Sequence, residues 1–163
     1  GPIIGQYEEK ISSMDTISTL YERIEKKGIK LLRTYLPKMA SGKFVTKEQN
    51  ELNRRIFPQR SPDDGLIDLD TSYKEIFNFI KAQTKPYPGA FLLDNKNQKM
   101  IIWSCNCFSH NHNKELGVII KYKSYIGISC SDGLIIPEKI NYNGKDINFN
   151  SKMISKFYGK EYE

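Results

Sequence analysis

The chain has 163 residues, of which 39% are hydrophobic and 12% aromatic, enough to bury the core of one domain or of two small ones. This composition excludes a wholly disordered chain, and the lack of any apolar run of about 18 residues excludes a membrane span. The net charge of +6 is evenly divided, since residues 1–86 carry 15 Lys and Arg against 12 Asp and Glu, and residues 87–163 carry 10 against 7. We therefore expect a soluble, cytoplasmic protein with a mildly basic surface and no membrane partner.

The first residues form a short strand-like stretch between Ile3 and Ile11, with no second strand nearby in the sequence. A single strand cannot satisfy its own backbone hydrogen-bonding groups. The stretch therefore predicts that a further segment precedes Gly1.

A long helix is predicted from Asp15 to about Leu36, because its apolar residues repeat at the spacing of one helical face. Asp15 is a suitable N-cap, and Pro37 is expected to end the helix. Gly28 leaves open whether this segment is one helix or two. The apolar positions are Ile17, Leu20, Tyr21, Ile24, Leu31, Leu32 and Tyr35.

A polar connector over residues 41–70 precedes a second helix. A connection of this length is uncommon in a compact domain and is often functional. Ser72 and Glu75 have the spacing of a capping box, and the apolar residues that follow keep a helical period. The helix is expected to end near 85–89, where two prolines and a glycine occur. We place the boundary between two domains there, at 1–86 and 87–163.

Short β-strands are predicted after Gly89. The dipeptide Asp132-Gly133 lies between β-branched runs and is a strong hairpin signal, and Asn143-Gly144 offers another turn. A short closing helix is expected at 151–158. Helices followed by short strands predict an α+β fold, with a small barrel of the oligonucleotide/oligosaccharide-binding (OB) type at the end. The expected strands are 90–93, 100–108, 116–122, 125–130 and 134–136.

Several of these segments, in this order, resemble the folate-dependent formyltransferases. The connector 60–68 resembles that family's basic-x-Pro-x-Asp-Gly-x-Ile-Asp element. Residues 76–91, which contain Pro-Tyr-Pro-Gly-Ala-Phe, resemble the helix that leads into the family's C-terminal barrel. Residues 125–133 resemble the late hairpin of that barrel. The resemblance covers nearly the whole chain.

The resemblance implies a formyl donor, N10-formyltetrahydrofolate, and catalytic Asn, His and Asp residues around its formyl carbon. The family's Asn-x-His motif and the Asp of its Asp-x-Gly element would precede this chain, the Gly of that element matching Gly1. His110 and His112 do not match the catalytic histidine. We therefore expect a chain that carries no catalytic residue, whose folate site lies mostly outside it, and which is inactive alone.

The pattern Cys105-x-Cys107-x-x-His110-x-His112 has the composition of a zinc site. Its spacing differs from that of the usual structural knuckle, and the resemblance implies no metal here. Buried strand cysteines followed by a polar loop are therefore favoured. The odd count of three cysteines also argues against a disulfide framework.

Two substrates are typical of the resembled family: a nucleotide-linked amino sugar and the aminoacyl end of initiator tRNA. The connector favours the sugar enzymes, which serve surface polysaccharides such as lipopolysaccharide, and the even charge distribution disfavours tRNA. A non-catalytic binding or dimerisation module is the third hypothesis, and the family implies a homodimer. The candidate binding residues are Arg60, Asp63, Asp64, Gly65, Ile67 and Tyr87. For Arg60, a phosphate contact and an ion pair with Asp63 or Asp64 remain alternatives.

Overall fold

The structure, a computed structural model, describes residues 1–94, 96–112 and 115–149. The chain forms two compact units, Gly1–Arg60 and Ser61–Glu163. This division lies upstream of the boundary expected near residue 86, because the second helix and its connector pack with the strands that follow them. Assignment of 1–86 and 87–163 to two domains stays a prediction. None of the described helices has the length and apolar composition needed to cross a membrane.

The first unit contains the helix α1 (Ile17–Ala40) and the 3-10 turn η1 (Glu51–Asn53). Thr16 is the N-cap, in a reciprocal capping box with Thr19, so the prediction of Asp15 was one residue early. Gly28 does not break the helix. Pro37 lies inside it rather than at its end, in the last turn, where only one intrahelical hydrogen bond is lost.

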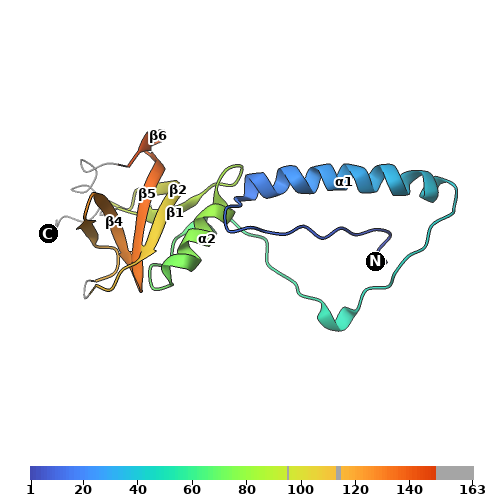
Figure 1. The fold of residues 1–163 in the computed structure, drawn as a ribbon, viewed down its shortest axis with the longest axis horizontal. Helices are drawn as coiled ribbons and strands as arrows, with labels where there is room; N and C mark the ends of the chain where they lie inside the picture. Colours follow the sequence, from blue (N-terminus) through green and yellow to red (C-terminus); the bar gives the residue numbers. More distant parts are fainter. Residues whose placement is uncertain (95, 113–114, 150–163) are drawn as a thin grey trace. The chain divides into compact units, whose positions relative to one another are not determined.

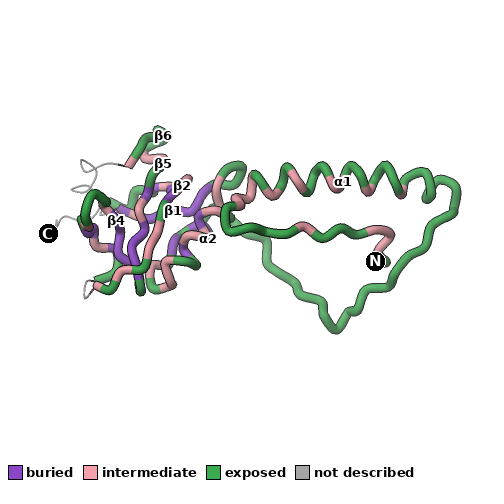
Figure 2. The backbone as a smooth tube through the Cα atoms, in the orientation of Figure 1, coloured by how far each residue is buried: buried purple, intermediate pink, exposed green. Residues whose placement is uncertain are grey.

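Within this unit the described side chains are not buried, and α1 has no buried residue (Figure 2). The expected strand at the start of the chain is reduced to one isolated bridge. There the backbone groups of Ile3 and Lys47 exchange two hydrogen bonds of 2.8 Å.

The second unit begins with the 3-10 turn η2 (Pro62–Gly65) and the helix α2 (Tyr73–Gln83). The helix was predicted from its capping box, which is present: Ser72 accepts a hydrogen bond from the Glu75 backbone N–H, and the Glu75 carboxylate accepts one from that of Ser72. Its apolar face places Ile76 and Ile80 in the core, at 2% and 1% exposure. Helix propensity, cap and burial therefore agree here.

Among the described residues, six strands follow in one antiparallel sheet, in the order β1-β2-β5-β4-β3, with β6 also paired to β5 (Figure 1). Strand β5 pairs with β2 along one edge; along its other edge it pairs first with β4 and then with β6. The described sheet is not closed, so the expected OB-like barrel is not confirmed. The strands are β1 (Ala90–Leu93), β2 (Lys99–Ser109), β3 (Ile119–Tyr122), β4 (Tyr125–Cys130), β5 (Gly133–Tyr142) and β6 (Lys145–Asn148).

Both predicted turns are present. Ser131 and Asp132 form the loop between β4 and β5, one residue earlier than predicted because Gly133 already pairs with Cys130 as the first residue of β5. Asn143-Gly144 joins β5 to β6 with φ angles of 53° and 74°. The expected strand at 134–136 is thus part of a longer one, β6 was missed, and β3 begins at 119 rather than 116. The closing helix expected at 151–158 lies outside the described residues.

The core of the second unit lies between α2 and the sheet, and Figure 2 shows its buried segments there. This is a mixed helical and antiparallel arrangement, so the α+β class is confirmed. The core residues below 2% exposure include Met100, Ile102, Ile119, Ile128, Ile135 and Ile140.

Candidate functional site

The end of the connector lies alongside β1. Within η2, Asp64 caps its own turn, since its carboxylate accepts a 2.5 Å hydrogen bond from the Ser61 backbone N–H. The chain then extends, and the Ile67 N–H donates to the Phe91 carbonyl at 2.9 Å, next to a parallel bridge between Leu66 and Phe91. The Ile67 side chain is 5% exposed and belongs to the core. The connector is therefore fixed to the sheet by its backbone and by one apolar side chain.

Two glycines allow the connector to approach the loop before β1. Gly65 is buried, and a Cβ atom there would lie 2.5 Å from the Gly89 carbonyl oxygen. Gly89 has a φ of +97°, and a Cβ atom there would lie 2.2 Å from the Ile101 side chain. Neither position has room for a side chain, and Gly89 adopts a conformation that favours glycine.

The predicted binding residues occupy three kinds of place. Gly65 and Ile67 are buried and structural, and Asp64 serves as a cap. Asp63 is at the surface, where its carboxylate lies 2.8 Å from the Lys99 ammonium. Tyr87 is 40% exposed, two residues before Gly89 in the loop that the connector contacts. Arg60 is exposed at the end of the first unit.

The Lys99 ammonium also lies 4.3 Å from the centroid of the Phe91 ring. This cation–π contact holds Lys99 between the ring and Asp63. The surface beside η2 therefore offers one carboxylate and one ammonium, which suits a ligand that carries hydroxyl, amine or phosphate groups.

A second polar cluster lies where Trp103 on β2 meets Asp146 on β6, and sequence analysis missed it. Asp146 accepts three hydrogen bonds: 3.0 Å from the Trp103 indole, 2.7 Å from the Asn141 amide and 2.8 Å from the Lys85 ammonium. These donors, Lys85 first, hold the pKa of the Asp146 carboxyl well below its usual range. Lys85 and Trp103 are 61 and 43 positions from Asp146, so no local spacing indicates the cluster.

The side chains of the suggested zinc pattern have other roles. Burial raises the pKa of the Cys105 thiol to about 12, which disfavours the thiolate that a metal requires. His112 directs Nε2 to the carbonyl oxygens of Cys130 and Gly133, at 2.9 and 3.3 Å. His110 lies 4.6 Å from the Tyr122 ring, centroid to centroid. In residues 1–94, 96–112 and 115–149 no three His, Cys, Asp or Glu side chains are placed to share a metal ion.

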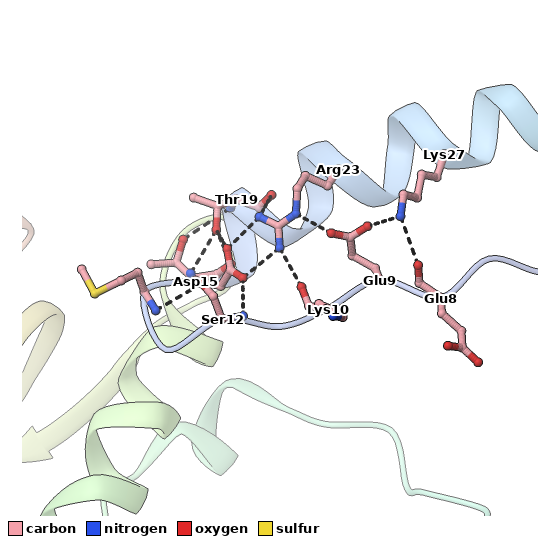
Figure 3. Close-up of polar contacts among 10 residues, drawn as sticks. Glu8, Glu9, Lys10, Ser12, Asp15, Thr19, Arg23 and Lys27 are labelled. Carbon is pink, nitrogen blue, oxygen red and sulfur yellow. Dashed lines mark hydrogen bonds and ion pairs between the residues drawn. The ribbon is translucent and has the colours of Figure 1, made fainter.

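In the first unit, Arg23 joins α1 to the extended segment before it (Figure 3). Its guanidinium donates to both carboxylate oxygens of Asp15, at 2.7 and 2.8 Å, and to Glu9 at 2.7 Å. Hydrogen bonds from Arg23 hold the pKa of Asp15 well below its usual range, and those from Lys27 and Arg23 lower the pKa of Glu9. This network fixes the segment on the helix.

Solved structures share this fold over much of the chain. A HypX variant from Aquifex aeolicus matches with a TM-score of 0.56 and 13% identity, over 94% of this chain and 29% of that one. The sugar 3N-formyl transferase WlaRD matches with a TM-score of 0.53 and 24% identity, over 89% of this chain and 50% of that one. An N-formyltransferase from Helicobacter canadensis matches with a TM-score of 0.52 and 23% identity, over 84% of this chain and 49% of that one.

The chain thus spans half or less of the length of these proteins, and at such identities the likeness shows a shared fold. The family model described as "Formyl transferase, C-terminal domain" matches residues 60–156. This range includes the connector end, α2 and the sheet, and it is more than half of the sequence. The chain therefore belongs to the formyl transferase C-terminal domain family.

Proposed function

We propose that this chain is the C-terminal part of an N-formyltransferase that moves a formyl group from N10-formyltetrahydrofolate to the amine of a nucleotide-linked amino sugar. Its family and the Arg60–Asp68 and Pro86–Phe91 motifs support this assignment. So do two proteins that share the fold: the Helicobacter canadensis enzyme in complex with folinic acid and dTDP-3-aminofucose, and WlaRD in the presence of dTDP and 5-N-formyl-THF.

The observation that carries the proposal is the packing of the connector on the loop before β1. The Gly65–Gly89 contact and the Ile67–Phe91 hydrogen bond bring the two motifs that resemble the sugar enzymes into one place. Both motifs leave a polar side chain at the surface there, Asp63 from the connector and Tyr87 from the loop. In this proposal Asp63 accepts hydrogen bonds from the amino sugar, and the Tyr87 ring contacts the sugar or the base. A phosphate contact by Arg60 stays a prediction.

The folate donor does not fit the residues of this chain. A pterin ring needs several donors and acceptors in fixed positions. Among the described residues, only one buried side-chain polar atom lacks a hydrogen-bond partner, and this is Nδ1 of His112. We therefore assign most of the folate site to parts of the enzyme outside this sequence, and on the resemblance we place the catalytic Asn, His and Asp there as well. This chain's own contribution is substrate docking and assembly, including assembly into a homodimer.

Initiator tRNA is the alternative substrate. The positive charge is not concentrated in residues 87–163, whereas binding to a phosphate backbone usually requires several clustered Lys and Arg. A non-catalytic binding or dimerisation module is the other alternative.

Binding measurements separate these hypotheses. We expect the chain to bind dTDP- or UDP-linked amino sugars with a modest salt dependence, and Asp63→Asn to weaken that binding. Asp70→Asn is the matched control, because Asp70 is also an exposed carboxylate but lies outside the 60–68 element. Steeply salt-dependent tRNA binding without sugar-nucleotide binding would instead indicate the tRNA enzyme. The chain alone should transfer no formyl group, and turnover above the no-enzyme control would refute the assignment of catalysis to other segments.

A further inference from the structure

The tryptophan on β2 is held in one position beside an open groove. Trp103 is the only tryptophan in the sequence, and its indole N–H is bonded to Asp146. The Lys85 ammonium lies 4.9 Å from the centroid of the Trp103 ring and is paired with the same carboxylate. A Cβ atom at Gly89 would lie only 2.7 Å from the ring. The indole is therefore fixed by three contacts before any ligand arrives.

The groove has a volume of about 570 Å³, which lies within the range of small-molecule sites. The Trp103 ring and the 38% exposed Ile147 side chain provide its apolar surface. Its polar surface comes from two lysines, one aspartate and one asparagine. The lining residues are Lys85, Trp103, Lys139, Asp146, Ile147 and Asn148.

The charges in the groove do not cancel. Asp146 is already engaged by three donors, including Lys85, so its charge is neutralised within the protein. Lys139 has no carboxylate partner among the residues that the structure describes, and it leaves one uncompensated positive charge in the groove. An uncompensated ammonium beside a fixed aromatic ring favours a ligand that is planar at one end and anionic at the other.

We propose that this groove binds a nucleotide, with the base against Trp103 and Ile147 and the phosphate on Lys139. A neutral sugar would leave Lys139 unused, and inorganic phosphate would leave the aromatic and apolar surface unused. This inference does not rest on the proposed function, because no groove residue belongs to the connector. A nucleotide bound here would contact the loop before β1 together with β2, β5 and β6, all within the second unit.

Trp103 provides a direct readout, since no other tryptophan contributes to the emission. The 163-residue chain is titrated separately with thymidine diphosphate, thymidine and inorganic phosphate while indole fluorescence is followed. A parallel titration of a free tryptophan analogue in solution controls for the inner-filter effect. We expect the diphosphate to quench the emission saturably and thymidine to bind at least about fivefold more weakly. Inorganic phosphate should compete with the diphosphate but should not itself quench the emission.

Lys139→Gln should weaken diphosphate binding about fivefold, the upper end for an exposed ion pair, and Lys139→Arg should restore it. Lys145→Gln is the matched control, because Lys145 is an exposed lysine on β6 that does not line the groove. Asp63→Asn should leave the quenching unchanged, which separates this site from the proposed substrate site. Equal urea midpoints would establish that the variants remain folded.

Three outcomes would overturn the proposal: no saturable quenching by the diphosphate, equal binding of thymidine and its diphosphate, or Lys139→Gln binding as well as the unmodified chain. A single-stranded oligothymidylate that binds far more tightly than the diphosphate would also overturn it, in favour of a nucleic-acid surface.

Discussion

A single methyl group at Gly65 should destabilise the second unit. In Gly65→Ala the new Cβ would lie 2.5 Å from the Gly89 carbonyl oxygen and 3.3 Å from Cδ1 of the Phe91 ring. The nearer atom belongs to the backbone, so no side-chain rotation relieves the contact. Either the connector must move away from the loop before β1, or β1 must shift in the sheet.

The cost of such overpacking is about 1–3 kcal/mol. For a unit of about 60–100 residues, each kcal/mol lowers the melting temperature by roughly 4–8 °C. We expect a loss within this range, since Gly65 is buried and the Ile67–Phe91 hydrogen bond lies two residues away.

Urea unfolding followed by Trp103 emission measures the free energy of unfolding of this unit. Gly28→Ala is the matched control, because a Cβ atom there meets nothing within 4 Å and alanine favours the helix. If Gly65→Ala unfolds at the same urea concentration as the unmodified chain, the close approach of the two backbones is not a real constraint and our account of the connector fails.

Three further predictions test other parts of the structure. First, the pKa values of Asp15 and Glu9 are lowered by Arg23 and Lys27, so their stabilising contribution is complete above the ordinary carboxyl pKa near 4 and is lost as the pH falls below it. Arg23→Gln should flatten this acid dependence in circular-dichroism titrations, and an unchanged profile would contradict the network. Second, Cys107 should react with iodoacetamide before Cys105, whose pKa burial raises to about 12, and mass spectrometry of partly labelled peptides checks the order. Equal labelling of the folded chain would argue against a buried Cys105. Third, Ile80→Ala should cost about 2–5 kcal/mol in urea unfolding because the side chain is 1% exposed, whereas Ile29→Ala, at 50% exposure, should change little.

The elements that were predicted correctly depend on local signals. The helix α2 follows from the Ser72–Glu75 capping box and the spacing of its apolar residues, which all lie within 11 residues. The turns at Ser131-Asp132 and Asn143-Gly144 depend on two residues each, and the first was predicted one residue late, at Asp132-Gly133. The errors were also local in origin, since the N-cap was placed at Asp15 instead of Thr16 and Pro37 was taken as the end of α1. A proline in the last turn disturbs little of the helix before it.

The contacts that build the candidate sites are long-range, and no spacing rule indicates them. The Ile67–Phe91 hydrogen bond joins residues on either side of α2, and the Trp103–Asp146 hydrogen bond spans 43 positions. The connector was selected through a resemblance, and Trp103 was not among the predicted site residues. The groove beside Trp103 depends on β6, a strand that the sequence did not predict.

Asp64-Gly65 illustrates how one dipeptide has two structural roles that the sequence cannot separate. It forms a turn, as its composition indicates, because Asp64 caps η2. Gly65 is nonetheless required for a different reason, since its missing side chain lets the Gly89 carbonyl approach. Substitutions at Gly65 or Ile67 therefore change folding together with the substrate contacts that we propose. Asp63 and Tyr87, both at the surface, are the positions where a loss of binding without a loss of stability can be attributed to the substrate.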